Sequence, residues 1–363
     1  MKPRIKIAIA GLASVLLVAA LLYATAAVLT GSPSLDRAAL AQSGGAVPGD
    51  SLGSESDAEI WRAIRRGAQG NVSIPDKKAG YMIQSAGENW RAIRNGPLSV
   101  YGTWAILGMI ALLALFFVFR GRIRIEHGAS GRVIERFNGL ERFAHWLLAN
   151  TFILLALTGL NVMYGRYVLK PFIGPEAFAT ITEIGKYIHN YVGFAFMVGI
   201  LMILVLWIRN NVPDKHDLVW IAKGGGMFTK GSHPPAKKFN AGQKILFWLV
   251  VLGGLSISVS GIALMFPFEF SLFSPTFAVL NVFGLGLPTD LTPMQEMQLS
   301  QLWHAVVALG LVAVIIAHIY IGTMGMEGAF DAMGTGEVDR NWAKEHHPLW
   351  LEEEERAEAR GDD

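Results

Sequence analysis

The chain has 363 residues, of which 52% are hydrophobic and 17% are charged, and its formal net charge is +2. It is more apolar than an ordinary soluble domain, and its overall charge is too small to recruit nucleic acid. It contains no cysteine, which excludes disulfides, cysteine-ligated iron–sulfur clusters and covalent attachment of c-type haem. Any redox cofactor must therefore be held by histidine, methionine or backbone groups.

Continuous apolar segments dominate the chain. In chain order they cover residues 7–29, 100–119, 143–164, 189–208, 245–266 and 302–323. A helix needs about 20 mostly apolar residues to cross a bilayer, and these segments approach or exceed that length. Because they are continuous and do not alternate with polar residues, they predict an all-α membrane protein and not a closed barrel of strands.

The first segment follows three basic residues, as in a signal peptide, but its length also suits an uncleaved anchor. An Ala-Leu-Ala sequence at 39–41 could be a cleavage site, so both interpretations stay open. Either one places residues 30–99 outside the cytoplasm. This region contains a repeated motif, EIWRAIRRG at 59–67 and ENWRAIRNG at 88–96. Each copy predicts a short amphipathic helix that ends at glycine, either docked on the membrane surface or binding a partner subunit.

The distribution of basic residues orients the remaining helices. Residues 120–142 contain six arginines and residues 209–244 contain seven lysines and arginines, whereas residues 267–301 contain neither. The positive-inside rule therefore places the two basic loops and the C-terminal tail in the cytoplasm, and the loops 165–188 and 267–301 on the other side. We predict a multi-pass protein of the bacterial inner membrane with a cytoplasmic C-terminus.

Four of the nine histidines lie in the apolar helices, namely His145, His189, His304 and His318. Polar groups at that depth are costly and usually functional. The other five lie in the predicted loops and tail, where we expect solvated or capping side chains. These five are His127, His216, His233, His346 and His347.

The predicted orientation sorts the four helical histidines into two levels. His304 and His318 are 14 residues apart, which is about 21 Å and close to four turns, so they share one helix face. His189 and His304 share the outer level, and His145 and His318 share the inner level. Two imidazoles at each of two levels in a helical bundle predict two b-type haems, each with two histidine ligands.

Other interpretations explain this pattern less well. A proton relay would require carboxylates in the same helices, and a single metal site would require ligands at one depth. A haem-free scaffold or transporter would require broken helices or an inverted repeat, and the sequence shows neither.

Several motifs carry a resemblance to a known family. They are ERFAHW (141–146), HNYVGF (189–194), RNNVPDKHDLVW (209–220), KFNAGQKILFW (238–248), His304 with His318, and EVDRNWAKEHHPLW (337–350). With these motifs, residues 138–352 resemble the gamma subunit of membrane-bound, quinone-linked formate dehydrogenase, which is a four-helix cytochrome b. Paired histidines in four helices also occur in the cytochromes b of nickel–iron hydrogenase and related reductases. A diheme subunit serving such a donor is therefore the alternative.

The resemblance implies a set of cofactors and partners. It implies two haem b groups on the same histidine pairs, and a cytoplasmic site for ubiquinone or menaquinone formed by His318, Asn240, Gly242 and Gln243. The sequence FNAGQK is also explained by Asn240 as a helix N-cap. The implied partners are an iron–sulfur (beta) subunit and a catalytic molybdenum or tungsten (alpha) subunit. This chain would then bind no formate and have no catalytic residue, and it would perform electron transfer and the quinone-reducing half-reaction.

The predicted organisation is a four-helix diheme cytochrome b bundle with an N-terminal extension, because the family form begins near residue 138. The parts are a signal peptide or anchor (1–29), an extracytoplasmic segment (30–99), an additional transmembrane helix (100–119), the diheme domain (120–324) and a cytoplasmic tail (325–363).

Overall fold

The computed structural model describes residues 85–229 and 231–360. The chain divides into two units, and the larger one includes all described residues from Ala92 onward. Of the smaller unit, the described part is the beginning of helix α4 (Ser85–Ile93). The predicted segment 7–29 and the first copy of the repeat lie outside the described residues.

Five helical segments among the described residues are long and apolar enough to cross a membrane. They are Asn89–Arg120, Gly139–Val168, Lys170–Asn211, Ala241–Met265 and Pro293–Gly325. Each overlaps one of the predicted apolar segments, which confirms the all-α membrane fold.

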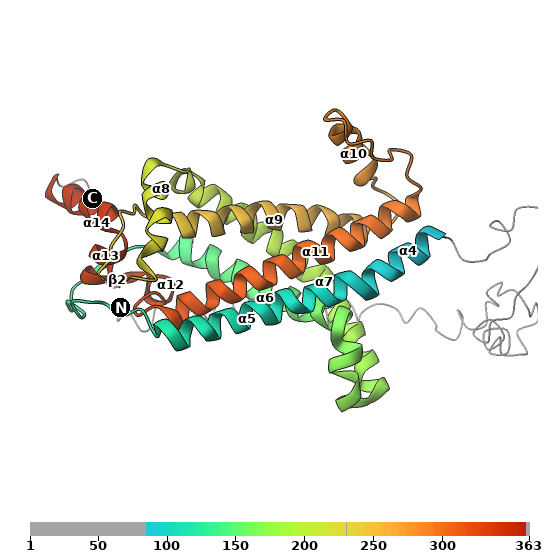
Figure 1. The fold of residues 1–363 in the computed structure, drawn as a ribbon, viewed down its shortest axis with the longest axis horizontal. Helices are drawn as coiled ribbons and strands as arrows, with labels where there is room; N and C mark the ends of the chain where they lie inside the picture. Colours follow the sequence, from blue (N-terminus) through green and yellow to red (C-terminus); the bar gives the residue numbers. More distant parts are fainter. Residues whose placement is uncertain (1–84, 230, 361–363) are drawn as a thin grey trace, which may run out of the picture. The chain divides into compact units, whose positions relative to one another are not determined.

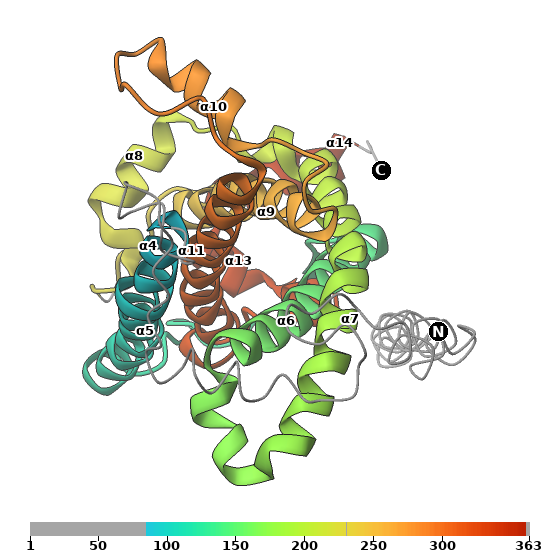
Figure 2. The same ribbon diagram turned by 90° about the vertical axis from the view of Figure 1, so that its right-hand side faces the viewer.

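Four of these segments form the bundle. Helix α6 (Gly139–Val168) packs along α7 (Lys170–Trp207), α7 packs against α9 (Ala241–Met265), and α9 packs against α11 (Pro293–Tyr320). Helix α5 (Ser99–Arg120) packs on α11 from outside this group (Figure 1). Figure 2, a view from the α10 end, shows the four bundle helices arranged around a common centre.

Three bundle helices begin before their apolar runs because polar residues fix their first turns. In each, the N-cap side chain accepts a hydrogen bond from the backbone three residues later, and the side chain there bonds back to the N-cap. The pairs are Asn138 with Glu141, Asn240 with Gln243, and Thr292 with Gln295. Because Thr292 caps it, α11 begins at Pro293, earlier than the predicted start at residue 302.

Two predicted boundaries are wrong. Residues 165–188 were expected to form a loop, but the chain stays helical and breaks only near Leu169 and at Gly174. Gly174 has φ 80°, a conformation that glycine adopts without strain. The helix expected to end at Gly96 instead continues through a π-helical segment, Arg94–Leu98, into α5. The wider π turn accommodates Pro97, which cannot donate a backbone hydrogen bond.

The segments after α5 that lie outside the bundle gather at its two ends (Figure 1). Helix α10 (Phe273–Asn281) lies at one end. At the other end, residues 121–138, 208–240 apart from residue 230, and 321–360 form what we call the tail cap. Its elements are β1 (Val133–Glu135), η2 (Ile208–Asn211), α8 (Lys215–Ala222), η3 (Gly224–Gly226), η4 (Ile321–Gly325), α12 (Asp331–Gly334), β2 (Glu337–Asp339), α13 (Arg340–His346) and α14 (Pro348–Arg360).

The tail cap joins distant parts of the chain. Strands β1 and β2 pair antiparallel, with Ile134 opposite Val338. Arg142, in the first turn of α6, donates to the carbonyl oxygens of Met333 and Gly334. The C-terminal segment is thereby fastened to the start of the bundle.

The expectation that His346 and His347 are surface residues is wrong. His347 is 1% exposed, its Nδ1 lies 2.7 Å from the carbonyl oxygen of Lys237, and its Nε2 lies 3.0 Å from Nη2 of Arg136. Burial, and then the charge of Arg136, hold the pKa of His347 well below its usual value. Spacing along the chain could not show this, because Arg136 is 211 residues away in sequence.

Candidate functional site

The four histidines of the apolar helices meet in two pairs. The ring centroids of His189 on α7 and His304 on α11 are 6.2 Å apart. Those of His145 on α6 and His318 on α11 are 6.1 Å apart. We call these the α7 pair and the α6 pair. Helix α11 contributes one ring to each, and the α6 pair lies toward the tail cap, where α6 begins and α11 ends.

The spacing within each pair fits one metal ion between the rings. A bond from a transition metal to an imidazole nitrogen is about 2 Å long, and the ring centre lies roughly 1 Å behind that nitrogen. Two imidazoles on opposite sides of one iron therefore have centroids about 6 Å apart. Both measured separations agree with this value.

The hydrogen bonding of the α7 pair frees the nitrogens that would bind a metal. The Thr158 hydroxyl donates to the carbonyl oxygen of Leu154 at 2.8 Å, and its oxygen lies 2.8 Å from Nδ1 of His189. Because the hydroxyl proton is already used, the hydroxyl oxygen accepts from Nδ1–H. The other ring nitrogen, Nε2, then keeps its lone pair for a metal.

His304 has the same arrangement. The Ser260 hydroxyl donates to the carbonyl oxygen of Ile257 at 3.0 Å, and its oxygen lies 3.0 Å from Nδ1 of His304. Ser260 is fully buried on α9. A hydrogen bond of this kind fixes the tautomer and the ring orientation of a metal-binding histidine.

Glycines lie against both rings of the α7 pair. A Cβ on Gly159 would lie 3.4 Å from Cε1 of His189, and one on Gly261 would lie 3.3 Å from Cε1 of His304. Each glycine directly follows the hydroxyl residue that bonds the same ring. The repeated dipeptides Thr158–Gly159 and Ser260–Gly261 are the sequence signal of these contacts, which the spacing of the histidines alone did not reveal.

The α6 pair is placed differently. Nδ1 of His145 is buried and has no hydrogen-bond partner among the described residues. The ring of Trp146 stands edge-on to the His145 ring at 5.2 Å, and its Nε1 donates to the carbonyl oxygen of Met333. This pair is therefore packed against the tail cap.

The two pairs fit haem better than a bare metal ion. Protein sites for bare ions use three or four protein ligands. Within the part of the chain that the structure describes, no group of three or more histidine, aspartate or glutamate side chains could hold a metal. A haem brings four ring nitrogens of its own and needs only two further imidazole ligands, and each pair contains two imidazoles.

The residues predicted for the quinone site lie at the start of α9 and near the end of α11. The side chains of Asn240 and Gln243 bond each other's backbone N–H at 3.0 Å, which confirms the N-cap interpretation. Gly242 lies against the indole of Trp220, which a Cβ would approach to 2.8 Å. No hydrogen bond among the described residues joins His318 to either capping side chain.

Comparison with known proteins agrees with this geometry. The family model for prokaryotic cytochrome b561 matches residues 136–336, which include all four paired histidines. The chain belongs to the prokaryotic cytochrome b561 family. This cytochrome is therefore a membrane-embedded helical bundle that carries haem.

Its relatives refine the comparison. The cytochrome b556(Fdn) subunit of the nitrate-inducible formate dehydrogenase of Escherichia coli is 28% identical over 64% of this chain and 96% of its own length. The cytochrome b556(fdo) subunit of the same species is 27% identical over 61% and 92%. The formate dehydrogenase cytochrome b556 subunit of Haemophilus influenzae is 29% identical over 64% and 87%. These similarities confirm the resemblance drawn from the sequence motifs. By name, the relatives are cytochrome b556 subunits of formate dehydrogenases and not their catalytic subunits.

Proposed function

We propose that this chain is the membrane-anchoring cytochrome b subunit of a formate dehydrogenase complex. In this proposal it carries electrons from an iron–sulfur subunit through two b haems to quinone at the cytoplasmic side. The observation that carries the proposal is the presence of two histidine pairs that share helix α11. Three similar proteins are named as subunits of formate dehydrogenases, which supports formate as the source of the electrons.

The histidine pairs would hold the two haems. A haem iron between two imidazoles exchanges one electron without binding substrate, which suits a relay. His189 and His304 would hold the outer haem, and His145 and His318 the inner one. The spacing of 14 residues from His304 to His318 separates the two levels by about 21 Å along α11. Thr158 and Ser260 would orient the outer ligands.

We propose that the tail cap faces the cytoplasm and the α10 end faces outward. The many basic residues of 120–142 and 209–244, and their absence from 267–301, support this orientation. The iron–sulfur (beta) subunit would then dock on the outer side, near the α7 pair. The catalytic (alpha) subunit, with molybdenum or tungsten, would follow it. Residues 1–29 would be the signal or anchor, 30–99 the extracytoplasmic segment and 325–363 the cytoplasmic tail.

The quinone site would lie beside the α6 pair. The start of α9 supplies Asn240, Gly242 and Gln243, and α11 supplies His318. Because the side chains of Asn240 and Gln243 cap the helix, backbone groups of this turn would meet the quinone.

The test is an optical difference spectrum of membranes that contain the complex, formate-reduced minus oxidised. We expect a b-type signal with formate that bleaches when a quinone analogue is added. If dithionite reduces the haems and formate does not, the diheme core stands and the formate assignment is wrong. Hydrogen would then be the next donor to test.

A further inference from the structure

A cluster of titratable side chains lies in the tail cap, apart from both histidine pairs. Nε2 of His233 lies 3.2 Å from the Glu126 carboxylate, and Nδ1 of His127 lies 2.9 Å from the Glu345 carboxylate. The backbone N–H of Glu126 donates to Glu345 at 3.0 Å, which joins the two contacts. His346 is the next residue along α13. The group therefore comprises two carboxylates and three imidazoles.

These side chains run from the surface to the interior. The His127 side chain is 74% exposed, that of Glu126 is 35% exposed, and that of Glu345 is 4% exposed. Nε2 of His346 is buried and has no hydrogen-bond partner among the described residues. An unpartnered buried polar atom is costly unless water reaches it.

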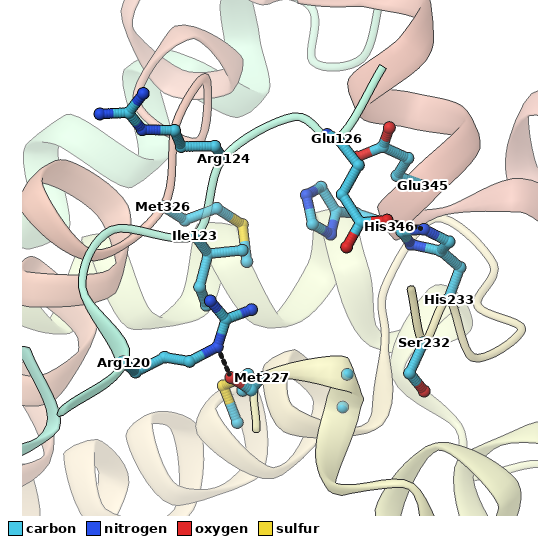
Figure 3. A pocket seen from close by; sticks show the side chains of 12 residues that line it. Arg120, Ile123, Arg124, Glu126, Met227, Ser232, His233, Met326, Glu345 and His346 are labelled. Carbon is cyan, nitrogen blue, oxygen red and sulfur yellow. Dashed lines mark hydrogen bonds and ion pairs between the residues drawn. The ribbon is translucent and has the colours of Figure 1, made fainter. Parts of the chain in front are cut away.

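A small cavity lies beside His346. It has a volume of about 20 Å³, and its lining includes Glu126, His233, Glu345 and His346. A single water molecule requires about 10–15 Å³ measured in this way, so the cavity has room for one. Figure 3 shows the two imidazoles and the two carboxylates on one side of the cavity, with Arg120 and Met227 on the other.

The cavity borders residues that neighbour the two segments that would form the quinone site. One wall is Met326, eight residues after His318 at the end of α11. Another wall is Gly225 and Gly226. Behind Gly225 lies the indole of Trp220, which also touches Gly242 at the start of α9. One indole thus separates the cavity from the predicted quinone turn.

We propose that Glu126, His233 and His346 form the proton-uptake site that supplies cytoplasmic protons for quinone reduction. This inference rests on the proposed function. Reduction of one quinone to quinol consumes two electrons, which arrive from formate through the bound haems, and two protons. The protons would be taken from cytoplasmic water at Glu126 and His233 and passed inward through His346 and the cavity water.

The charges around the cluster suit this role. The hydrogen bond from the Gly231 N–H lowers the pKa of Glu126 despite partial burial, so an exposed carboxylate remains available to attract protons. Burial would raise the pKa of Glu345, but hydrogen bonds from the 126–127 backbone and from His127 lower it. Arg120 and Arg124 also line the cavity.

His346 is suited to pass protons and not to store them. Burial lowers its pKa to about 4, so it is neutral at neutral pH. A neutral imidazole can accept a proton at one nitrogen and release one from the other. The charges of Glu345 and Glu126 oppose the effect of burial, whereas His233 and Arg136 add to it.

The experiment uses the purified complex with Glu126→Gln and His346→Asn. Glutamine keeps an oxygen that accepts from Gly231, so the fold of the cap should persist. The matched controls are Glu135→Gln on β1 and His216→Asn on α8, which do not line the cavity. Three quantities are measured across pH: the rate of haem reduction by formate without quinone, the haem midpoint potentials, and the steady-state rate of quinone reduction.

We expect both test variants to keep haem content, potentials and formate-driven haem reduction. Their quinone-reduction rate should fall by roughly tenfold or more at high pH, where protons are scarce, and approach the unmodified rate at low pH. Added imidazole, a small diffusible proton carrier, should restore the Glu126→Gln rate. A purely structural defect would not respond to it.

Each other outcome is decisive. If the unmodified complex reduces quinone with formate and both variants follow its pH profile, the proton-uptake inference is wrong while the proposed function stands. If the variants lose rate equally at all pH values and imidazole does not rescue them, the inference is also wrong. If the unmodified complex does not reduce quinone with formate, the proposed function is wrong and the inference falls with it.

Discussion

The Ser260 hydroxyl should tune the outer haem, and replacing it with alanine tests this. Ser260 accepts from Nδ1–H of His304 at 3.0 Å while donating its own proton to the α9 backbone. This bond makes the imidazole a stronger electron donor and so stabilises the oxidised iron. Ser260→Ala removes the bond, and the potential of the outer haem should rise.

The hydrogen bond sets the size of the shift. A net hydrogen bond contributes about 0.5–1.5 kcal/mol, and bonds between membrane helices average about 0.6 kcal/mol. For one electron, a tenfold change in equilibrium corresponds to about 59 mV and about 1.4 kcal/mol. Because the bond exists in both oxidation states, these energies are upper bounds: the expected rise is at most about 25 mV for a bond of about 0.6 kcal/mol, and at most about 60 mV for one of about 1.5 kcal/mol. The inner haem should not shift.

The assay is a redox titration of the b-type absorbance of the purified complex, fitted with two components. The control is Ser258→Ala on the same helix, whose hydroxyl donates to the Gly254 carbonyl oxygen. We expect no shift in the control. If both midpoint potentials stay unchanged in Ser260→Ala, or if one shifts downward, the reasoning about the His304 ring is refuted.

Three further predictions concern ligands, pH and the quinone turn. His304→Ala and His145→Ala should each halve the haem content per chain; variants that retain both haems would show that these residues are not ligands. His347 stays neutral in the folded protein because its pKa is lowered, whereas the unfolded chain takes up a proton below about pH 6.5. The free energy of unfolding should therefore fall by up to ~1.4 kcal/mol for each pH unit below about 6.5, which thermal unfolding measures. A melting temperature that does not fall as the pH is lowered would contradict this. Asn240→Ala should lower the free energy of unfolding by about 1 kcal/mol through the lost cap, whereas Asn240→Asp keeps the cap and should leave the KM for quinone unchanged, because backbone groups of the turn would meet the quinone; a raised KM in Asn240→Asp would show that the side chain itself meets the quinone.

The sequence was sufficient to predict the membrane bundle and the meeting of the histidines. A helix rises by a fixed amount per residue, so the spacing of His304 and His318 gives their depths directly. The alternation of basic loops then gives a level to His145 and His189. The first step depends on the geometry of one helix and the second on the distribution of basic residues along the chain, and neither requires knowledge of how the helices pack.

The sequence was not sufficient where contacts join distant segments. The hydrogen bonds that the His189 and His304 rings donate to Thr158 and Ser260 depend on how α6 packs against α7 and how α9 packs against α11. A serine or threonine in an apolar helix usually hydrogen-bonds the backbone of that helix, so the sequence pattern does not reveal that it also contacts a histidine of another helix. The burial of His347 beside Arg136 has the same origin.

The amount of haem b per chain tests the central claim most directly. It is measured as the pyridine haemochrome of the purified complex, divided by the amount of this chain. Two histidine pairs predict two haem b groups per chain. A value of one would mean that one of the pairs binds no haem, and a value of zero would contradict the account.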